Sequence, residues 1–295
     1  MQDTTERLLT RFKALADSVR MRILAICAHG ECSVSELTHV LALSQPRVSQ
    51  HLKQLCAAGL LERFRDGQFA YYRLPFRGDD AAERRRLLAL LPAGEPTFAR
   101  DIDRLREFRG VPAAAPTAID SDDDARRLHR ALVALTVTAP VGDLLDIGSG
   151  QGRILKLLAS RAGRAVGVDI DADARQFARA ELLLAGVENV SLRKGNMYAL
   201  PFDDEFDTVI LDDTLATADE PILAICEARR LLKPTGRIIL LATLHDGDSA
   251  RLETLFAGWC QAAGLRLASP QRVPQKTPRW LLAVATPAGA DAAAA

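Results

Sequence analysis

The sequence predicts an α/β protein of two domains: a helical part that ends in a hairpin, followed by a sheet of mostly parallel strands. Three observations carry this prediction. Two helical stretches joined by a short turn precede an Asp66-Gly67 pair, and Asp-Gly is the strongest two-residue hairpin signal. Apolar strands and helices alternate from about residue 126 to 286, which is the pattern of a parallel sheet. Between these parts, residues 110–124 are rich in proline, alanine and acid and predict a linker.

The composition fits two folded domains without a membrane anchor. The 295 residues suffice for two domains of about 100–200 residues each. Hydrophobic residues make up 48%, yet no uncharged apolar run reaches the about 18 residues of a transmembrane helix. The first residues, MQDTTERLLTRF, lack the apolar region of a secretory signal. The cysteines are scattered and odd in number, which fits a reducing cytoplasm and no disulfide framework. They are Cys27, Cys32, Cys56, Cys226 and Cys260.

Charge is unevenly divided along the chain, although the net charge is zero. Residues 1–78 carry 11 Lys and Arg against 7 Asp and Glu, an excess of four positive charges, and the remainder carries an equal negative excess. A basic first part suits a partner made of phosphates, such as DNA. The alternative is a chance asymmetry without a function.

The first part reads as a series of helices around one hairpin. Apolar positions recur at helical spacing over residues 4–28, and Gly30 ends that stretch. The further elements expected are a short helix over 34–41, a helix over 45–56, two strands within 61–74, and helices over 79–91 and 98–108.

The helix pair 34–41 and 45–56 has the dimensions of a helix-turn-helix. Ser44 is placed as the N-cap of the second helix, and Pro46 lies in its first turn, where a missing N–H costs nothing. Val48, Leu52 and Leu55 fall on one face and are expected to pack inward.

The opposite face of that helix carries side chains that suit DNA recognition. Arginine reads guanine edges, glutamine reads adenine, and serine or lysine takes phosphate. The candidates are Gln45, Arg47, Ser49, Gln50 and Lys53. The hairpin adds Arg63, Arg65 and Arg73 as candidates for a wing over the neighbouring backbone. An amphipathic helix pair with a solvated polar face is the alternative.

Residues 12–74 resemble the ArsR/SmtB family of winged-helix repressors nearly end to end. The resemblance lies in FKALADSVRMRIL (12–24), SELTHVLALSQPRVSQHLKQLCAAGLLERFRDG (35–67) and YYRL (71–74). It implies a repressor that binds double-stranded operator DNA. Helices over 5–16 and 79–91 lack an obvious partner within so small a core, so we expect a homodimer that places two recognition helices about 34 Å apart.

The metal-binding pattern of that family is missing at its usual place. Metal-sensing members carry a Cys-x-Cys pair where this chain has Ser33-Val34-Ser35. Thiolates are the soft ligands for arsenic, zinc or cadmium, and hydroxyls are not, so no metal site is expected. Cys32 is one residue out of register. Cys27 resembles the first of two cysteines in redox-sensing relatives, but residues 79–110 supply no second one, so a buried apolar role is expected.

The second part predicts a seven-stranded, mostly parallel, Rossmann-like sheet. The expected strands are 143–147, 165–169, 190–194, 207–212 and 236–242, with two more near 265–273 and 279–286 that close the sheet. The tail after Pro287 is expected to be disordered.

A glycine turn after the first of these strands predicts a nucleotide-type ligand. Gly148, Gly150 and Gly152 let the backbone turn sharply and approach a ligand with no Cβ in the way. Asp169 ends the next strand, about 20 residues on, where an acid can accept hydrogen bonds from ribose hydroxyls. Arg153 stands where a dinucleotide motif has its third glycine, which argues against a nicotinamide cofactor.

Residues 126–286 resemble the class I methyltransferases that bind S-adenosylmethionine. The resemblance lies in LLDIGSGQG (144–152), Asp169, GNMYALPFDDEFDTVIL (195–211), EARRLLKPTGRIILL (227–241) and a final antiparallel pair. It implies S-adenosylmethionine or S-adenosylhomocysteine as the ligand. By position, the ligand-binding residues would be Asp146, Gly148, Gly150, Gly152, Asp169, Ile170, Asn196, Met197 and Asp212. Asn196 departs from the more usual Asp that accepts from the adenine amine.

Catalytic residues are harder to find than ligand-binding ones. Methyl transfer needs an aligned nucleophile and often a base, and Asp212 and Asp213 are the candidates after the fourth strand. The N–P–P–Y type motif of DNA and amine methyltransferases is absent. The sequence therefore supports ligand binding more strongly than it supports chemistry.

Three functions remain open at this point. The first is a repressor whose second domain senses the adenosyl ligand, the role that the resemblance implies and the one we favour. The second is a working small-molecule methyltransferase with a regulatory winged helix. The third gives the first part a dimerisation role only. The expected domains are a winged helix-turn-helix domain over 1–91, a helical segment and linker over 92–125, a methyltransferase-like domain over 126–287, and the tail over 288–295.

Overall fold

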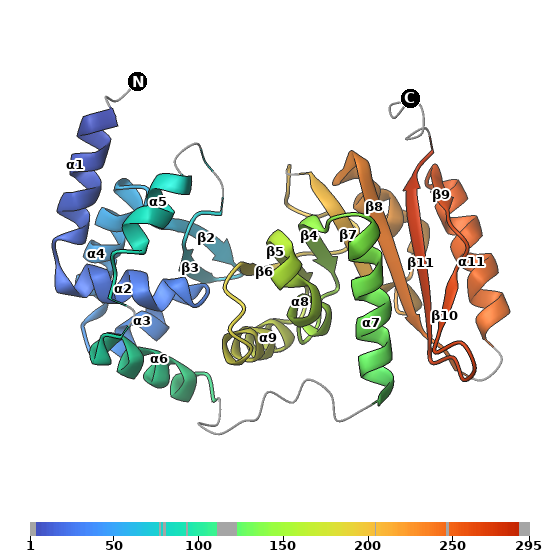
Figure 1. The fold of residues 1–295 in the computed structure, drawn as a ribbon, viewed down its shortest axis with the longest axis horizontal. Coiled ribbons are helices and arrows are strands. Elements are labelled where there is room, and N and C mark those ends of the chain that lie inside the picture. The colour runs from blue at the N-terminus through green and yellow to red at the C-terminus, as the bar shows by residue number, and fades with distance from the viewer. Residues whose placement is uncertain are drawn as a thin grey trace. The chain divides into compact units, whose positions relative to one another are not determined.

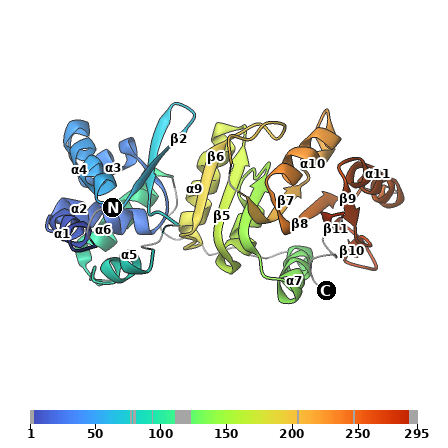
Figure 2. The same ribbon diagram turned by 90° about the horizontal axis from the view of Figure 1, so that it is seen from above.

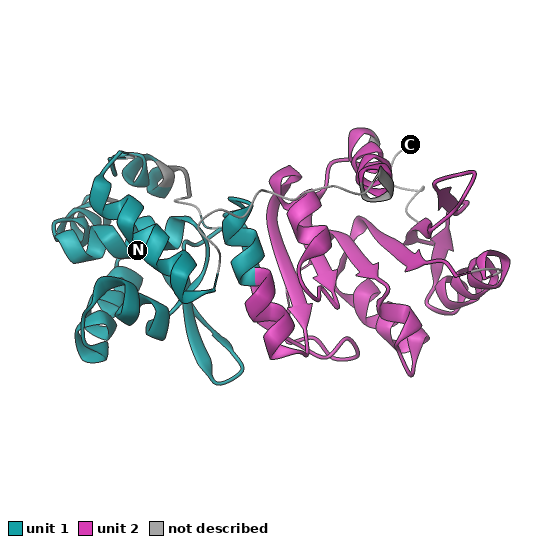
Figure 3. Cartoon of the chain, turned by 90° about the horizontal axis from the view of Figure 1, so that it is seen from below, with its two compact units in different colours: residues 1–117, 179–191 teal, residues 118–178, 192–295 magenta. Residues whose placement is uncertain are grey.

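A computed structural model describes residues 4–76, 78, 81–92, 94–110, 123–203, 205–245 and 248–288. The chain divides into two compact units (Figure 3). Unit 1 comprises residues 1–117 and 179–191, and unit 2 comprises residues 118–178 and 192–295. Most of the expected linker over 110–124 and of the expected tail over 288–295 lies outside the described residues. In the described part of the chain, no helix combines the length and apolar character needed to cross a membrane.

Unit 1 is built from helices and a small antiparallel sheet (Figure 1). Its helices are α1 (Thr4–Leu15), α2 (Ser18–Ala28), α3 (Val34–Leu41), α4 (Gln45–Ala57), α5 (Ala81–Leu88) and α6 (Pro96–Phe108). The strands β1 (Cys32–Ser33), β2 (Glu62–Asp66) and β3 (Phe69–Arg73) form a sheet in the order β1-β3-β2.

The helical stretch over 4–28 is two helices, and the first, α1, lies close to the helix expected over 5–16. Asp17 is the N-cap of α2 and its carboxylate accepts a hydrogen bond from the Arg20 N–H, so a new helix begins there. The two helices differ in how far they bury their apolar side chains. Ile23, Leu24 and Ile26 of α2 are fully buried, whereas Leu9 and Phe12 of α1 are exposed.

The helix-turn-helix forms as expected. Ser33 and Glu36 make a capping box that begins α3, and Ala42 ends it in the left-handed conformation (φ 53°). Ser44 occupies the N-cap of α4 but makes no side-chain capping hydrogen bond, and Pro46 lies in the first turn. The inward face of α4 is fully buried: Val48, Leu52 and Leu55 are each 0% exposed.

The hairpin also forms at the expected place. Strands β2 and β3 are antiparallel with Asp66 opposite Phe69, so Gly67 and Gln68 make a two-residue turn. Gly67 has a φ of +59°, the left-handed region that glycine enters without strain.

Unit 2 is organised around an α/β sheet. Its α-helices are α7 (Asp123–Thr138), α8 (Arg153–Leu158), α9 (Ala172–Leu184), α10 (Pro221–Arg230) and α11 (Ser249–Ala262). The strands are β4 (Gly142–Ile147), β5 (Ala162–Asp169), β6 (Val190–Lys194), β7 (Phe206–Asp212), β8 (Leu232–Thr243), β9 (Leu265–Leu267), β10 (Gln271–Val273) and β11 (Trp280–Pro287). The unit boundary falls within α9 and within β6.

The strand order is β10-β11-β8-β7-β4-β5-β6, with β9 also paired to β11 (Figure 2). Strands β5, β4, β7 and β8 are parallel neighbours, while β11 is antiparallel to β8. The sheet is therefore mostly parallel, as expected, but within the described residues it has eight strands rather than seven. The segment expected as one strand over 265–273 is β9 and β10, interrupted near Pro270, which has no N–H for a ladder.

This topology creates a switch point between β4 and β7. From β4 the chain adds β5 and β6 on one side, and it then returns to place β7 and β8 on the other. In open α/β sheets, ligands bind outside the carboxyl ends of the strands at such a point. Buried side chains such as Leu145, Val209 and Ile238 pack the sheet rigidly beneath that edge.

Candidate functional site

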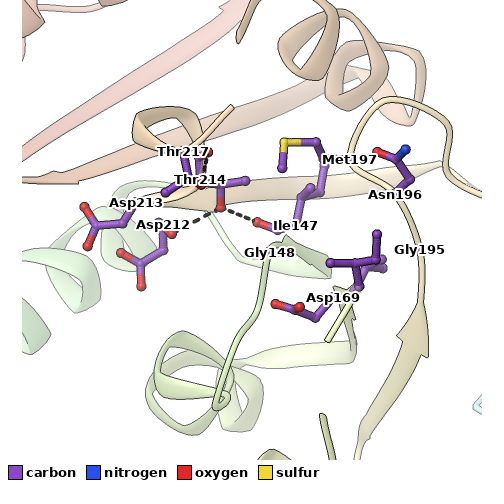
Figure 4. A pocket seen from close by; sticks show the side chains of 12 residues that line it. Ile147, Gly148, Asp169, Gly195, Asn196, Met197, Asp212, Asp213, Thr214 and Thr217 are labelled. Carbon is purple, nitrogen blue, oxygen red and sulfur yellow. Dashed lines mark hydrogen bonds between the residues drawn. The ribbon is translucent and has the colours of Figure 1, made fainter. Parts of the chain in front are cut away.

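A cavity of about 270 Å³ opens at the carboxyl ends of β4, β5 and β7, where the strand order switches direction (Figure 4). Its lining combines glycines, apolar side chains and acids, a mixture suited to a ligand with an aromatic base, a sugar and a charged end. The lining residues are Ile147, Gly148, Val168, Asp169, Ile170, Gly195, Asn196, Met197, Asp212, Asp213, Thr214 and Thr217.

The glycine turn after β4 requires glycine for two separate reasons. Gly148 has a φ of +72°, and a Cβ there would come within 2.4 Å of Oγ1 of Thr214. Thr214 is itself fixed, because its hydroxyl donates to the Ile147 carbonyl at 2.8 Å. Gly150 also has a positive φ, +48°, but open space surrounds it. The turn can therefore bring its backbone close to a ligand.

Asp169 connects the turn to the end of β5. One carboxylate oxygen accepts from the Gly150 N–H at 2.7 Å and the other accepts from the Asp171 N–H at 2.8 Å. Each carboxylate oxygen can accept a further bond. The side chain is thus oriented by the backbone and can still receive two vicinal hydroxyls.

The cavity lining also contains uncharged side chains. Ile170 is 67% exposed, and Met197 lies across the cavity in the loop after β6 (Figure 4). The Asn196 side-chain carbonyl accepts from the Tyr198 N–H at 3.1 Å, so it has a fixed orientation. A Cβ on the neighbouring Gly195 would come within 2.4 Å of Val168, which explains a glycine at this place.

Asp146 lies in β4 beneath the cavity, and its carboxylate is unusual. It is 1% exposed, and among the described residues neither of its oxygens has a hydrogen-bond partner. Burial, together with the charges of Asp212 and Asp169, raises the pKa of Asp146 well above its ordinary value. The Arg153 guanidinium opposes part of this rise, and a further cationic group nearby would favour ionisation of Asp146.

Both candidate bases are already engaged. Arg153 holds Asp212 in a bidentate pair, with Nη2 at 2.7 Å from Oδ1 and 2.8 Å from Oδ2. Burial raises the pKa of Asp212, and the Arg153 guanidinium opposes part of that rise. Asp213 adopts a left-handed φ of 54° and its carboxylate accepts from both the N–H and the hydroxyl of Thr243, at 2.5 and 2.6 Å.

The cavity gathers most, but not all, of the expected ligand-binding residues. Those that line it are Gly148, Asp169, Ile170, Asn196, Met197 and Asp212. Asp146, Gly150 and Gly152 do not line it; Gly152 begins α8 as its N-cap. Sequence reasoning missed the contributions of Ile147, Val168, Gly195, Thr214 and Thr217. Of these five residues, only Gly195 could have been found from the sequence, because it is a glycine that directly precedes the predicted residue Asn196.

The candidate recognition face of α4 is open. Its five polar candidates are all exposed: Gln45, Arg47, Ser49, Gln50 and Lys53. Because the apolar face of the same helix is fully buried, the polar face is held in one orientation on a rigid support. A recognition helix needs this arrangement to reach base edges in the major groove.

The hairpin presents two of its three arginines. Arg63 and Arg65 alternate along β2 and both are exposed. Arg73 is buried, its Nε donates to Glu62, and its guanidinium stacks over Phe64 at 5.0 Å and Phe76 at 4.6 Å. The expectation that Arg73 contacts the DNA backbone is therefore wrong. Glu62, which lies opposite Arg73 in the hairpin, and the rings of Phe64 and Phe76 hold this side chain inside unit 1.

Ser33, one of the two serines at the position where metal-sensing relatives carry cysteines, has a structural role. The Ser33 hydroxyl accepts from the Glu36 N–H at 3.3 Å, and the Glu36 carboxylate accepts from the Ser33 N–H at 2.6 Å. In the part of the chain that the structure describes, no group of three or more His, Cys, Asp or Glu could hold a metal ion. Cys27 is buried, as expected, but it does have a thiol neighbour: hydrogen bonding to Cys32, with burial, raises the pKa of Cys27.

Two families match separate parts of the chain. Residues 17–63 match the family described as bacterial regulatory protein, arsR family. Residues 145–240 match the family described as methyltransferase domain.

The curated relatives follow the same division. An arsenic resistance transcriptional regulator of Pseudomonas putida is 56% identical over 64 residues, 21% of this chain and 50% of that protein. The arsenical resistance operon repressor of Bacillus subtilis is 37% identical over 79 residues, 25% of this chain and 75% of that protein. A ubiquinone/menaquinone biosynthesis C-methyltransferase of Hahella chejuensis is 35% identical over 103 residues, 33% of this chain and 41% of that protein. The chain spans about half the length of the first relatives it matches.

Proposed function

Because the chain belongs to the arsR family of bacterial regulatory proteins and also carries a methyltransferase domain, we propose that it is a transcriptional repressor that senses an adenosyl ligand. The repressor binds operator DNA as a homodimer in the cytoplasm. Its ligand is S-adenosylmethionine or S-adenosylhomocysteine, and the cavity at the carboxyl ends of β4, β5 and β7 is where that ligand binds.

The cavity residues suit each part of such a ligand. Asp169 accepts the two ribose hydroxyls, because its oxygens are oriented and can accept further bonds. Ile170 and Met197 contact the faces of the adenine, and Asn196 is next to its amine. Burial and the neighbouring acids raise the pKa of Asp146, and the cationic amino-acid end of the ligand would favour ionisation of this carboxyl group.

One observation favours a sensor over an enzyme. The two candidate bases, Asp212 and Asp213, are held by Arg153 and Thr243 respectively. A general base must be free to reach the proton that it removes. Among the described residues that line the cavity, both candidate carboxylates are therefore engaged, while the groups that suit ligand binding remain available.

A working methyltransferase is the second candidate, and a specific observation favours it. Asp212 lines the cavity, and burial raises its pKa toward the range of a useful base. If an acceptor molecule displaced Arg153 from Asp212, this carboxylate could take a proton during methyl transfer.

A single pair of titrations distinguishes the two functions. Operator DNA is first selected from a random pool with the full-length protein, and its affinity is measured by fluorescence anisotropy with and without each adenosyl ligand. A sensor changes its operator affinity by about fivefold or more when the ligand binds. Transfer of labelled methyl groups to acceptors, measured in parallel, is expected to be absent. Operator affinity that ignores both ligands at millimolar concentration would contradict the sensor.

A further inference from the structure

Arg179 lies at the centre of a buried charge network in unit 1. Although α9 begins in unit 2, its residues from Arg179 onward belong to unit 1 (Figure 3). The Arg179 guanidinium donates from Nε to Glu31 at 2.7 Å and from Nη2 to Asp66 at 2.7 Å. It also lies over the ring of Tyr71, 4.1 Å from the centroid. The side chains of Arg179, Glu31 and Asp66 are only 5%, 4% and 4% exposed.

A second arginine extends this network to α3. Arg109 donates from Nε to Glu36 at 2.7 Å, and its other nitrogens donate to the backbone carbonyls of Glu31 at 2.8 Å and Arg179 at 3.3 Å. Glu36 completes the capping box that begins α3. The network therefore contacts the helix-turn-helix at its first helix, α3, through Glu36, and the wing through Asp66.

The position of Asp66 gives Arg179 a direct effect on the wing. Asp66 ends β2, immediately before the turn, and Arg65 is its neighbour on that strand. An uncompensated carboxylate there would repel DNA phosphates beside the arginine that attracts them. While Arg179 holds Asp66, that negative charge is compensated and buried.

The same helix begins at the ligand cavity. The Asp171 N–H donates to the Asp169 carboxylate, and the Asp171 carbonyl accepts from the Arg175 N–H. The Arg175 side chain returns to donate to the Asp169 carbonyl at 3.0 Å. Arg179 follows Arg175 by four residues, about one helical turn. Asp169 and Arg179 are therefore linked by the hydrogen bonds and the backbone of one continuous helix.

We propose that Arg179 is the positioning residue through which adenosyl binding changes operator binding. The inference rests on the proposed sensor function and adds its mechanism. When ligand hydroxyls bind Asp169, the hydrogen bond between Asp169 and the start of α9 changes. The hydrogen bonds from Arg179 to Asp66 and Glu31 change as a result. A ligand shifts an equilibrium only when it binds two states with different affinity. In this proposal, the two states of the repressor differ in the hydrogen bonds from Arg179 to Asp66 and Glu31.

Four variants of the full chain test this coupling. Arg179→Met removes the charge but keeps an apolar stem of similar length. Gln176→Met is the matched control, since Gln176 is an exposed residue of the same helix. Asp66→Asn removes one carboxylate, and the double variant Arg179→Met with Asp66→Asn removes both members of the Arg179–Asp66 pair. For each, calorimetry gives the affinity for S-adenosylhomocysteine and S-adenosylmethionine, and anisotropy gives operator affinity with and without them.

The coupling predicts a separation of these two measurements. Arg179→Met should bind both ligands as the wild type does, yet its operator affinity should no longer respond, whereas the wild type and Gln176→Met respond by about fivefold or more. Its operator affinity without ligand should fall, and Asp66→Asn should restore that affinity but not the response. A merely structural role would not separate the response from the basal affinity in this way.

The outcomes are distinguishable. A responsive wild type together with an equally responsive Arg179→Met overturns the coupling and leaves the sensor function standing. A wild type that ignores both ligands overturns the sensor function itself, and the coupling with it. If circular dichroism shows that Arg179→Met is unfolded, Arg179→Lys decides instead. A lysine retains the charge but not the two-pronged geometry, so its response should be reduced, and a full response would overturn the coupling.

Discussion

At the scale of single residues, several acids of the candidate site differ only in their surroundings. Asp169 has both oxygens oriented by backbone N–H groups, Asp212 is paired with an arginine, and Asp146 is buried without a partner among the described residues. Three chemically identical carboxyl groups therefore have three different roles near this cavity. Asp169 suits ligand hydroxyls, Asp212 forms an ion pair, and Asp146 favours a cation. Each purpose can be tested by removing one group.

Asp169→Ala should lower the affinity for both adenosyl ligands at least about tenfold. The reason is the loss of two charge-assisted hydrogen bonds to the ribose, each worth about 1.5–3 kcal/mol. Isothermal titration calorimetry measures the change. Asp173→Ala is the control, because Asp173 is an exposed acid outside the cavity. Equal affinities for the wild type and Asp169→Ala would show that the ribose lies elsewhere.

Asp146 should make stability depend on pH. Its pKa in the fold is raised, so the protonated form favours folding, and this contribution declines as pH rises above the ordinary value near 3.8. Asparagine cannot ionise. The melting temperature of Asp146→Asn relative to the wild type should therefore increase from about pH 4 upward and level off once Asp146 is charged in the fold. Thermal melts across pH 4 to 8 measure this, and a constant difference between the two proteins would refute it.

Arg47→Ala and Gln50→Ala should each weaken specific operator binding by about 1–3 kcal/mol. Both side chains are exposed on the face of α4 opposite its buried residues. Arg65→Ala should instead weaken binding to all sequences alike and lower the salt dependence, because a wing arginine meets phosphate. Anisotropy titrations with operator and random DNA at several salt concentrations separate the two effects. An unchanged operator affinity in Arg47→Ala would remove α4 from the recognition role.

At the scale of elements, local chemistry predicted most of the fold. The Asp-Gly pair, the glycine turn and the alternating apolar strands each specify their element from neighbouring residues, and helices α3 and α4 and strands β4 to β8 form where expected. Sequence reasoning missed contacts between residues that are far apart in the sequence. Arg153 and Asp212 are 59 residues apart, and Thr243 reaches Asp213 across 30. The burial of Arg73 was missed although its partners are close in the sequence: Glu62 lies opposite it in the hairpin, and its guanidinium stacks over Phe64 and Phe76.

The capping box at the start of α3 leads to a prediction about metals. Ser33 uses its hydroxyl to begin the helix, at the position where metal-sensing relatives carry a thiolate. Zinc, cadmium and arsenite should therefore not release the protein from its operator, because hydroxyls are poor ligands for soft ions. A titration of the protein–DNA complex with each ion, followed by anisotropy, tests this. Release at micromolar concentration would mean that other cysteines bind the ion.

At the scale of the whole molecule, unit 1 presents an apolar surface on α1. Leu9 and Phe12 are 52% and 47% exposed, although such side chains usually pack against a partner. We expect this surface to join two copies of the chain. Light scattering in the presence of operator DNA should give the mass of a dimer, and Leu9→Lys with Phe12→Lys should shift it toward the monomer and weaken operator binding. A monomeric wild type at micromolar concentration would contradict this expectation.

The membership of residues 179–191 in unit 1 limits how this protein can be divided. A gene truncated after the first part would encode a repressor that lacks Arg179, the counter-charge of Glu31 and Asp66, and lacks Leu183, which completes the apolar core of that unit. We therefore expect the shortened repressor to aggregate or to bind DNA poorly. A recombination event that replaced the second part with an unrelated one is therefore expected to lower the stability of the first.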